Sequence, residues 1–146
     1  MEKRYNLPET DLEGFNELLK LEAFCQKNTW MKSLAHLIKV RASQINKCVY
    51  CINMHTNEAL KAGETLQRIV LLPAWQEAPV FTEQERVVLE MTESMTLISQ
   101  AGFPEALYAK AKIFFTDKEI AQLALAIGLI NLWNRVVLCS GNKDVS

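Results

Sequence analysis

No segment of this sequence is long and apolar enough to suggest a membrane-spanning helix. The longest apolar stretch runs from Ile120 to Trp133 and is interrupted by Gln122 and Asn131, whereas a spanning helix needs about 20 apolar residues. Residues 1–8 include basic side chains, but no apolar run follows them, so a secretory signal is not expected. These absences favour a cytoplasmic protein that does not bind a membrane.

The sequence also lacks an excess of charge of either sign. It has 16 Lys and Arg residues against 17 Asp and Glu residues, and its formal net charge is -1. Such a chain has no general electrostatic attraction for nucleic acid. Flavin, haem and nucleotide-binding motifs are also missing, so we expect no cofactor and no direct use of NAD(P)H.

Apolar residues recur at helical spacing along most of the chain, and little of it resembles a strand. Capping-box pairs at Thr82/Glu85 and Thr116/Glu119 predict two helix starts, and Gly63 predicts a helix end. The expected helical segments are 11–27, 30–45, 48–62, 64–72 (ended by Pro73), 82–99, 104–115 and 116–139. We therefore predict an all-α fold, with residues 1–146 forming a single-domain bundle of about six to seven helices.

The last expected helix, 116–139, is apolar on most of its sides. A helix of this kind needs neighbours on most sides. It is either the central helix of a monomer or is partly buried against another subunit, and the pattern alone does not choose between the two.

The most informative pattern is a Cys-x-x-Cys pair, Cys48 and Cys51, with His55 four residues after the second cysteine. On a helix these three side chains fall within a sector of about 60°. Asn46 is a suitable N-cap, which would place the thiols where the helix dipole favours a thiolate. His55, one turn beyond Cys51, is placed to exchange a proton with it. The pattern favours thiol redox chemistry at the start of a helix.

The same motif also fits a zinc half-site or a pair of buried small hydrophobic residues. A structural zinc site usually has four ligands, and the motif supplies three. Cys25, Cys139 or His36 would have to be the fourth, and no second pair has metal-ligand spacing. We therefore expect no bound metal, interpret Cys25 and Cys139 as structural, and expect Tyr50 to pack rather than react.

The stretch from Arg41 to His55 resembles the core motif of the alkyl hydroperoxidase D and carboxymuconolactone decarboxylase superfamily, in its Cys-x-x-Cys branch. The similarity extends over most of the chain, through 57–63, 72–75, 81–86 and 130–135. The resemblance implies a helical homo-oligomer, commonly a trimer or a hexamer built from trimers. It thus favours burial of the last helix against another subunit.

The resemblance further implies a thiol-dependent peroxidase. In the family the second cysteine is peroxidatic and the first is resolving, so Cys51 would form a sulfenic acid and then a disulfide with Cys48. An external dithiol, lipoamide-linked or thioredoxin-like, would reduce this disulfide. Spacing alone leaves the order open. Cys48 lies nearer the helix start, where the dipole and the solvent should act on it more strongly, whereas Cys51 has His55 as a base. The lactone decarboxylase branch of the superfamily lacks the cysteine pair.

One position departs from the family pattern. Peroxidases of the family carry a glutamate 12 positions before the first motif cysteine, where it polarises the histidine, and this chain has His36 there. A neutral imidazole can relay a proton but offers no negative charge to an imidazolium. Because Lys32, Lys39 and Ser43 lie near the same helical stripe, we expect His36 on a solvated face.

A different class of function uses the same residues. A redox or metal sensor, or a disulfide-exchange protein, would change the state of the thiol pair without consuming a substrate. The sequence does not identify the peroxide, the electron donor or the pathway.

Overall fold

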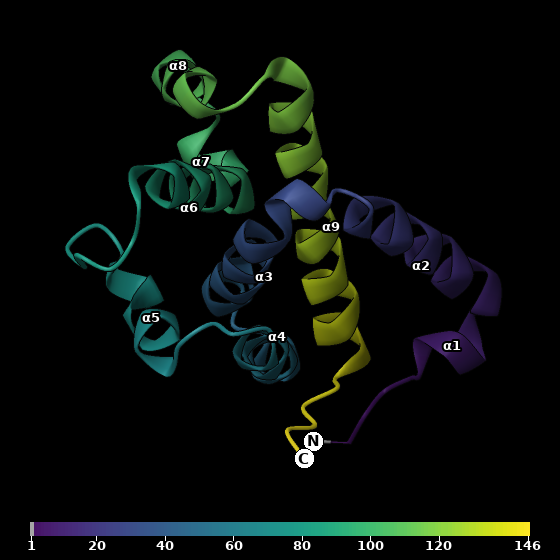
Figure 1. The fold of residues 1–146 in the computed structure, drawn as a ribbon. Helices are drawn as coiled ribbons and strands as arrows, with labels where there is room; N and C mark the ends of the chain where they lie inside the picture. The colour runs from purple at the N-terminus through teal and green to yellow at the C-terminus, as the bar shows by residue number, and fades with distance from the viewer. Residues whose placement is uncertain (1) are drawn as a thin grey trace.

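Helix follows helix through residues 2–146, the part of the chain that the computed structural model describes, and no strand occurs within it (Figure 1). The α-helices are α1 (Leu7–Thr10), α2 (Leu12–Gln26), α3 (Lys32–Ile45), α4 (Val49–Lys61), α5 (Leu66–Leu71), α6 (Glu83–Thr96), α7 (Ile98–Ala101), α8 (Glu105–Phe114) and α9 (Asp117–Ser140). Two 3₁₀ turns, η1 (Thr29–Met31) and η2 (Leu72–Ala74), connect neighbouring helices. The prediction of an all-α fold is confirmed.

Local capping signals set several helix ends as predicted. In α6 the Thr82 hydroxyl accepts from the Glu85 amide at 3.1 Å, and the Glu85 carboxylate accepts from the Thr82 amide at 2.9 Å. The same reciprocal pair, Thr116 and Glu119, opens α9. Gly63 follows α4 with a φ of 99°, a conformation that favours glycine. These boundaries depend only on residues within one helical turn of each other.

Pro73 does not stop helical structure as the sequence suggested. Helix α5 already ends at Leu71, and Pro73 lies inside the 3₁₀ turn η2. Proline is tolerated in the first positions of a helical turn, because no intrahelical partner is required for an amide hydrogen there.

Helix α3 lies at the centre of the fold, between two hydrophobic clusters (Figure 1). Leu34 and Ile38 join the cluster formed with α6, α8 and α9. Leu37 and Val40, on another face of α3, join the cluster formed with α4, η2 and α6. α3 is thus the helix with packing partners on most sides, whereas α9 leaves Leu125 46% and Leu132 39% exposed.

Contrary to the expectation from the sequence, helix α9 is long and apolar enough to cross a membrane, judged by length and composition alone. In this fold it packs against α2, α3, α4, α6 and α8, and the core helix of a soluble bundle has the same length and composition. Its outer side carries a stripe of four exposed apolar or small residues: Ala121, Leu125, Gly128 and Leu132.

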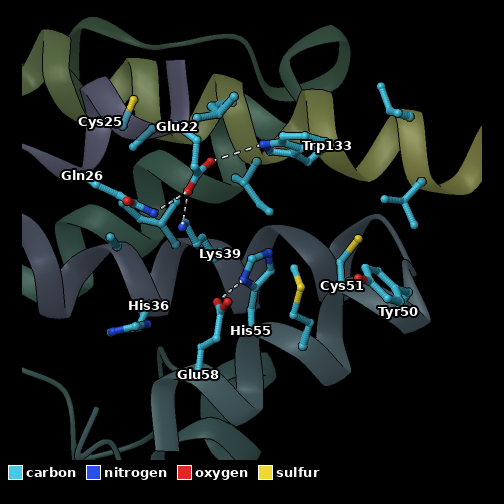
Figure 2. A pocket seen from close by; sticks show the side chains of 18 of the residues that line it. Glu22, Cys25, Gln26, His36, Lys39, Tyr50, Cys51, His55, Glu58 and Trp133 are labelled. Carbon is cyan, nitrogen blue, oxygen red and sulfur yellow. Dashed lines mark hydrogen bonds and ion pairs between the residues drawn. The ribbon is translucent and has the colours of Figure 1, made fainter. Parts of the chain in front are cut away.

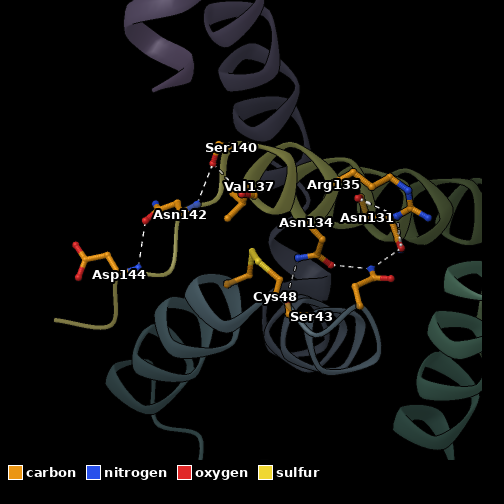
Figure 3. Close-up of a disulfide and its surroundings, with 11 residues drawn as sticks. Ser43, Cys48, Asn131, Asn134, Arg135, Val137, Ser140, Asn142 and Asp144 are labelled. Carbon is orange, nitrogen blue, oxygen red and sulfur yellow. Dashed lines mark hydrogen bonds between the residues drawn. A yellow bond between two sulfur atoms is a disulfide. The ribbon is translucent and has the colours of Figure 1, made fainter. Parts of the chain in front are cut away.

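Buried polar side chains join the turn between α3 and α4 to α9 (Figure 3). The Asn46 side-chain amide donates to the side-chain oxygens of Asn131 and Asn134, both at 2.9 Å. Asn134, which is fully buried, donates in turn to the Ser43 hydroxyl at 3.0 Å. Each of these bonds satisfies a group that would be costly to bury alone. The network therefore holds the start of α4 in a defined position on α9.

This network corrects the expectation that Asn46 caps α4. The N-cap residue is Cys48, whereas Asn46 ends α3 and its backbone amide bonds to the Ala42 carbonyl at 2.9 Å. Between them Lys47 adopts a φ of 57°, the one positive value of a non-glycine residue within residues 2–146. The Asn46 amide faces the asparagines of α9, so its side chain is not available to the amides of α4.

Replacing Asn134 by alanine should destabilise the fold measurably. The change removes the partner of the Ser43 hydroxyl and one of the two acceptors of Asn46, and leaving buried polar groups unsatisfied costs about 1–3 kcal/mol. Urea unfolding of the Cys48–Cys51-oxidised protein at one fixed concentration measures the change.

The matched control is Asn57→Ala, which alters an exposed asparagine on α4. It should change the free energy of unfolding by no more than about 0.5 kcal/mol. Equal effects of the two substitutions would show that the buried network contributes nothing particular to stability.

Candidate active site

The structure places the three residues of the sequence motif on the buried side of α4. Cys48 and Cys51 are each 1% exposed and His55 is 7% exposed, and Ala59 continues the same face one turn further on. Cys48 and Cys51 form a disulfide, with their Cα atoms 5.3 Å apart (Figure 3). The pair is therefore close enough to cycle between dithiol and disulfide without moving the backbone far.

A cavity of about 870 Å³ lies beside this face, between α1–α2 and the surface formed by α3, α4 and α9 (Figure 2). Cys51 and His55 line the cavity, and Cys48 does not. Much of the remaining wall is apolar, formed by residues that include Met31, Ile38, Met54, Leu129, Ile130 and Val137. A molecule in the cavity would meet Cys51 before Cys48.

The solvent exposure of the two motif cysteines differs from what the sequence suggested. Cys48, at the helix start, was expected to be the more solvated thiol, but both cysteines are equally buried. Helix α9 packs against α4. What distinguishes the thiols is the cavity, which Cys51 lines and Cys48 does not.

His55 has a carboxylate partner that was not predicted from the sequence. Its Nδ1 lies 2.8 Å from Oε2 of Glu58, whose side chain is 49% exposed (Figure 2). This hydrogen bond, more than any other influence, lowers the pKa of Glu58 below its usual value. Glu58 follows His55 by three residues, and i, i+3 side chains are neighbours on a helix. That spacing was the available signal.

His36 does not lie on a solvated face, so that expectation was wrong. It lines the same cavity as Cys51 and His55, and its Nε2 atom is buried without a hydrogen-bond partner. Burial, with a further effect of the Lys39 charge, lowers its pKa. His36 is therefore a neutral imidazole at neutral pH. The groups that act on it electrostatically include Glu58 and His55 of α4, and a helical pattern within α3 alone could not reveal that proximity.

A polar contact among three helices holds α2 in place over the cavity. Glu22 of α2 accepts from Nζ of Lys39 at 2.7 Å and from the indole nitrogen of Trp133 at 3.2 Å (Figure 2). The Glu22 and Lys39 side chains are only 20% and 22% exposed, so water screens their attraction less than at the surface. This contact links α2, α3 and α9 around the cavity.

The other two cysteines differ in their surroundings. Cys25 lines the cavity, and burial raises the pKa of its thiol, which disfavours a reactive thiolate. Cys139 is exposed near the end of α9, so it does not pack as a core residue. Tyr50 is partly buried and also lines the cavity.

Among residues 2–146 there is no group of three or more His, Cys, Asp or Glu side chains arranged to hold a metal ion. Within these residues, neither Cys25, Cys139 nor His36 forms such a group with the motif. The arrangement is that of a dithiol pair with a nearby imidazole and carboxylate.

Comparison with known proteins places these features in a family. The model of the carboxymuconolactone decarboxylase family matches residues 12–94, which include the whole Cys-x-x-Cys motif and His55. The uncharacterised protein YdfG of Bacillus subtilis is 36% identical over 146 residues, covering 100% of this chain and 99% of that protein. The uncharacterised protein YnjA of Escherichia coli is 23% identical over 96 residues, covering 66% of this chain and 52% of YnjA.

Two solved structures share the fold. A protein of unknown function from Agrobacterium tumefaciens, suggested to be the antioxidant defence protein AhpD, superposes with a TM-score of 0.95 at 36% identity, covering 99% of this chain and 100% of that chain. An uncharacterised peroxidase-related protein from Silicibacter superposes with a TM-score of 0.79 at 26% identity, covering 90% of this chain and 70% of that one. The family model, the relative matched over its full length and the shared helical fold all point to one family. This chain belongs to the carboxymuconolactone decarboxylase family.

Proposed function

We propose that this protein is an antioxidant thiol oxidoreductase that reduces hydrogen peroxide or organic hydroperoxides. Membership of a family with AhpD-like relatives and the presence of a Cys-x-x-Cys pair support antioxidant function in general. The observation that carries the specific proposal is the position of Cys51 and His55, one helical turn apart on the wall of one largely apolar cavity. A thiol, a base and a binding space for an organic group are thus combined.

In the first step, His55 takes the proton of the Cys51 thiol and the resulting thiolate attacks the terminal oxygen of the hydroperoxide. The O–O bond breaks, Cys51 becomes a sulfenic acid, and the alkoxide leaves as an alcohol after receiving a proton, which the imidazolium of His55 can supply. The sulfur is oxidised by two electrons and the peroxide is reduced by two. Hydrogen peroxide would give water in place of the alcohol.

In the second step, the Cys48 thiol attacks the sulfenic sulfur of Cys51 and water leaves, which forms the disulfide. The short Cα separation of the pair supports this step. An external dithiol, lipoamide-linked or thioredoxin-like, then reduces the disulfide by exchange and becomes a disulfide itself. A reducing cytoplasm is the compartment in which such a cycle runs.

The competing function is a redox or metal sensor, or a disulfide-exchange protein, on the same fold. Thiol counting with 4-vinylpyridine before and after one equivalent of hydrogen peroxide, together with metal analysis, separates the two. A peroxidase supplied with a dithiol consumes many equivalents of peroxide per chain. A sensor stops after one oxidation of the pair.

We also propose that the protein is a homo-oligomer, a trimer or a hexamer. The exposed stripe on α9, from Ala121 to Leu132, supports this, because contiguous exposed apolar surface commonly marks a protein–protein contact. Gly128 within the stripe leaves room for close approach, since nothing lies within 4 Å of a Cβ atom added there.

Cys51→Ser should abolish peroxide consumption, whereas Cys48→Ser should allow one round of oxidation that stops at a sulfenic acid. Of the two motif cysteines only Cys51 lines the cavity with His55, and Cys48 is close enough to resolve it. Single-turnover oxidation followed by dimedone labelling and intact mass measures both. Dimedone adducts on Cys48 of the Cys51→Ser variant, formed at the wild-type rate, would reverse the assignment.

His55→Ala should slow the oxidation of Cys51 by roughly 10²–10⁴-fold, the usual contribution of a general base. Stopped-flow mixing of the reduced protein with peroxide gives this rate. A loss below about threefold in that assay would remove His55 from the mechanism, since general-base catalysis contributes far more than this.

Leu132→Glu should dissociate the oligomer, because it places a charge within the exposed α9 stripe. Sedimentation equilibrium of the wild-type protein should give a multiple of the 16.6 kDa chain mass, and that of the variant a smaller species. The control is Leu66→Glu, at an exposed leucine outside the stripe. A wild-type protein found only as a single chain at micromolar concentration would contradict the proposal.

A further inference from the structure

We propose that Glu58 is the positioning residue of His55, and that it supplies the negative charge that position 36 cannot supply in this chain. The inference rests on the proposed role of His55 as the base for Cys51. It assigns to Glu58 a function that neither the motif spacing nor the position of the cysteines indicates.

The geometry of the pair carries the argument. Nδ1 of His55 and Oε2 of Glu58 are 2.8 Å apart, within one turn of the same helix. The His55 ring is buried, so its orientation is held by packing as well as by this bond. The Glu58 carboxylate is half-exposed, and it therefore keeps its charge without a large desolvation cost.

The protonation states follow from this contact. An ionised carboxylate only accepts hydrogen bonds, so the hydrogen between the two residues belongs to Nδ1 of His55. In the neutral ring Nε2 then has a free lone pair, which is the form a base requires. When Nε2 takes a proton from Cys51, the charge on Glu58 stabilises the imidazolium. Glu58 thereby raises the fraction of Cys51 that is thiolate.

Among the described residues that line the cavity, no other carboxylate is available to His55. The cavity-lining acids are Glu22 and Glu58, and Glu22 is bonded to Lys39 and Trp133. His36 lies in the same cavity, within electrostatic reach of both His55 and Glu58. A neutral imidazole at position 36 adds no negative charge, so Glu58 is the carboxylate that acts on His55.

The test is the rate at which iodoacetamide labels Cys51, measured in a Cys48→Ser background by peptide mass spectrometry. This rate follows the thiolate fraction and requires no peroxide. Glu58→Gln should slow labelling by about 10-fold at pH 7, less than the full contribution of a general base. In a His55→Ala background, the same substitution should have no further effect, because Glu58 acts only through His55.

The matched control is Glu17→Gln, which removes an exposed glutamate that also has an i, i+3 partner, Lys20. Glu17→Gln should leave the labelling rate unchanged, and circular dichroism should show equal helicity for all variants. Equal labelling of Glu58→Gln and the parent protein, or an equal loss with and without His55, would overturn the inference. If the coupling is found while the wild-type protein consumes no peroxide, the proposed function fails and the role of Glu58 stands.

Discussion

The site depends on the buried polar junction that joins the end of α3 to α9. Asn46 at the turn bonds to Asn131 and Asn134, and Asn134 reaches back to Ser43 of α3. Asn131 and Asn134 are buried and Asn46 is partly buried, so each group keeps its partner and the turn has few alternative positions. The next helix consequently starts at a set place, with Cys48 as its N-cap. The position of the cysteine pair in the molecule follows from hydrogen bonds made several residues away.

The second structural requirement is the placement of α2. This helix has no buried residue of its own, yet it forms one wall of the cavity. Its contact with the body of the protein includes the Glu22–Lys39–Trp133 group and the edge-to-face pair of Phe15 and Trp133. A helix held by so few contacts is the part of the site most able to move, because local opening follows low packing density.

The chain departs from the family pattern at one position, and the carboxylate that contacts His55 comes from a different helix than that pattern implies. His36 stands where the resemblance to peroxidases of the family implies a glutamate, and the Nε2 atom of its half-buried ring is buried without a hydrogen-bond partner. The carboxylate in contact with the motif histidine lies on α4 itself. A carboxylate one turn from its histidine holds the same partner whether or not α3 shifts. The orientation of His55 is thereby tied to the same helix that carries Cys51.

Much of this protein is determined by the sequence alone, where the deciding contacts lie within one or two helical turns. The two capping boxes, the helix end at Gly63 and the shared face of Cys48, Cys51 and His55 were all predictable, because α-helix geometry relates residues that are close in the chain. The Glu58 contact has the same local origin, and its i, i+3 spacing from His55 was a signal that the sequence already contained.

The tertiary structure decided which residues far apart in the sequence come into contact, and where the cavity forms. Asparagine is a common N-cap residue, but the side chain of Asn46 donates to two buried acceptors on α9 and therefore does not cap α4. His36 and Lys39 belong to a polar stripe of α3 that looks solvated in the sequence. In the fold, Lys39 bonds to Glu22 of α2, and both His36 and Lys39 line the cavity. The cavity exists only between α2 and three other helices, and it distinguishes two cysteines that are equally buried. Burial depends on which surfaces meet, and a helical pattern reports only the surface that one helix presents.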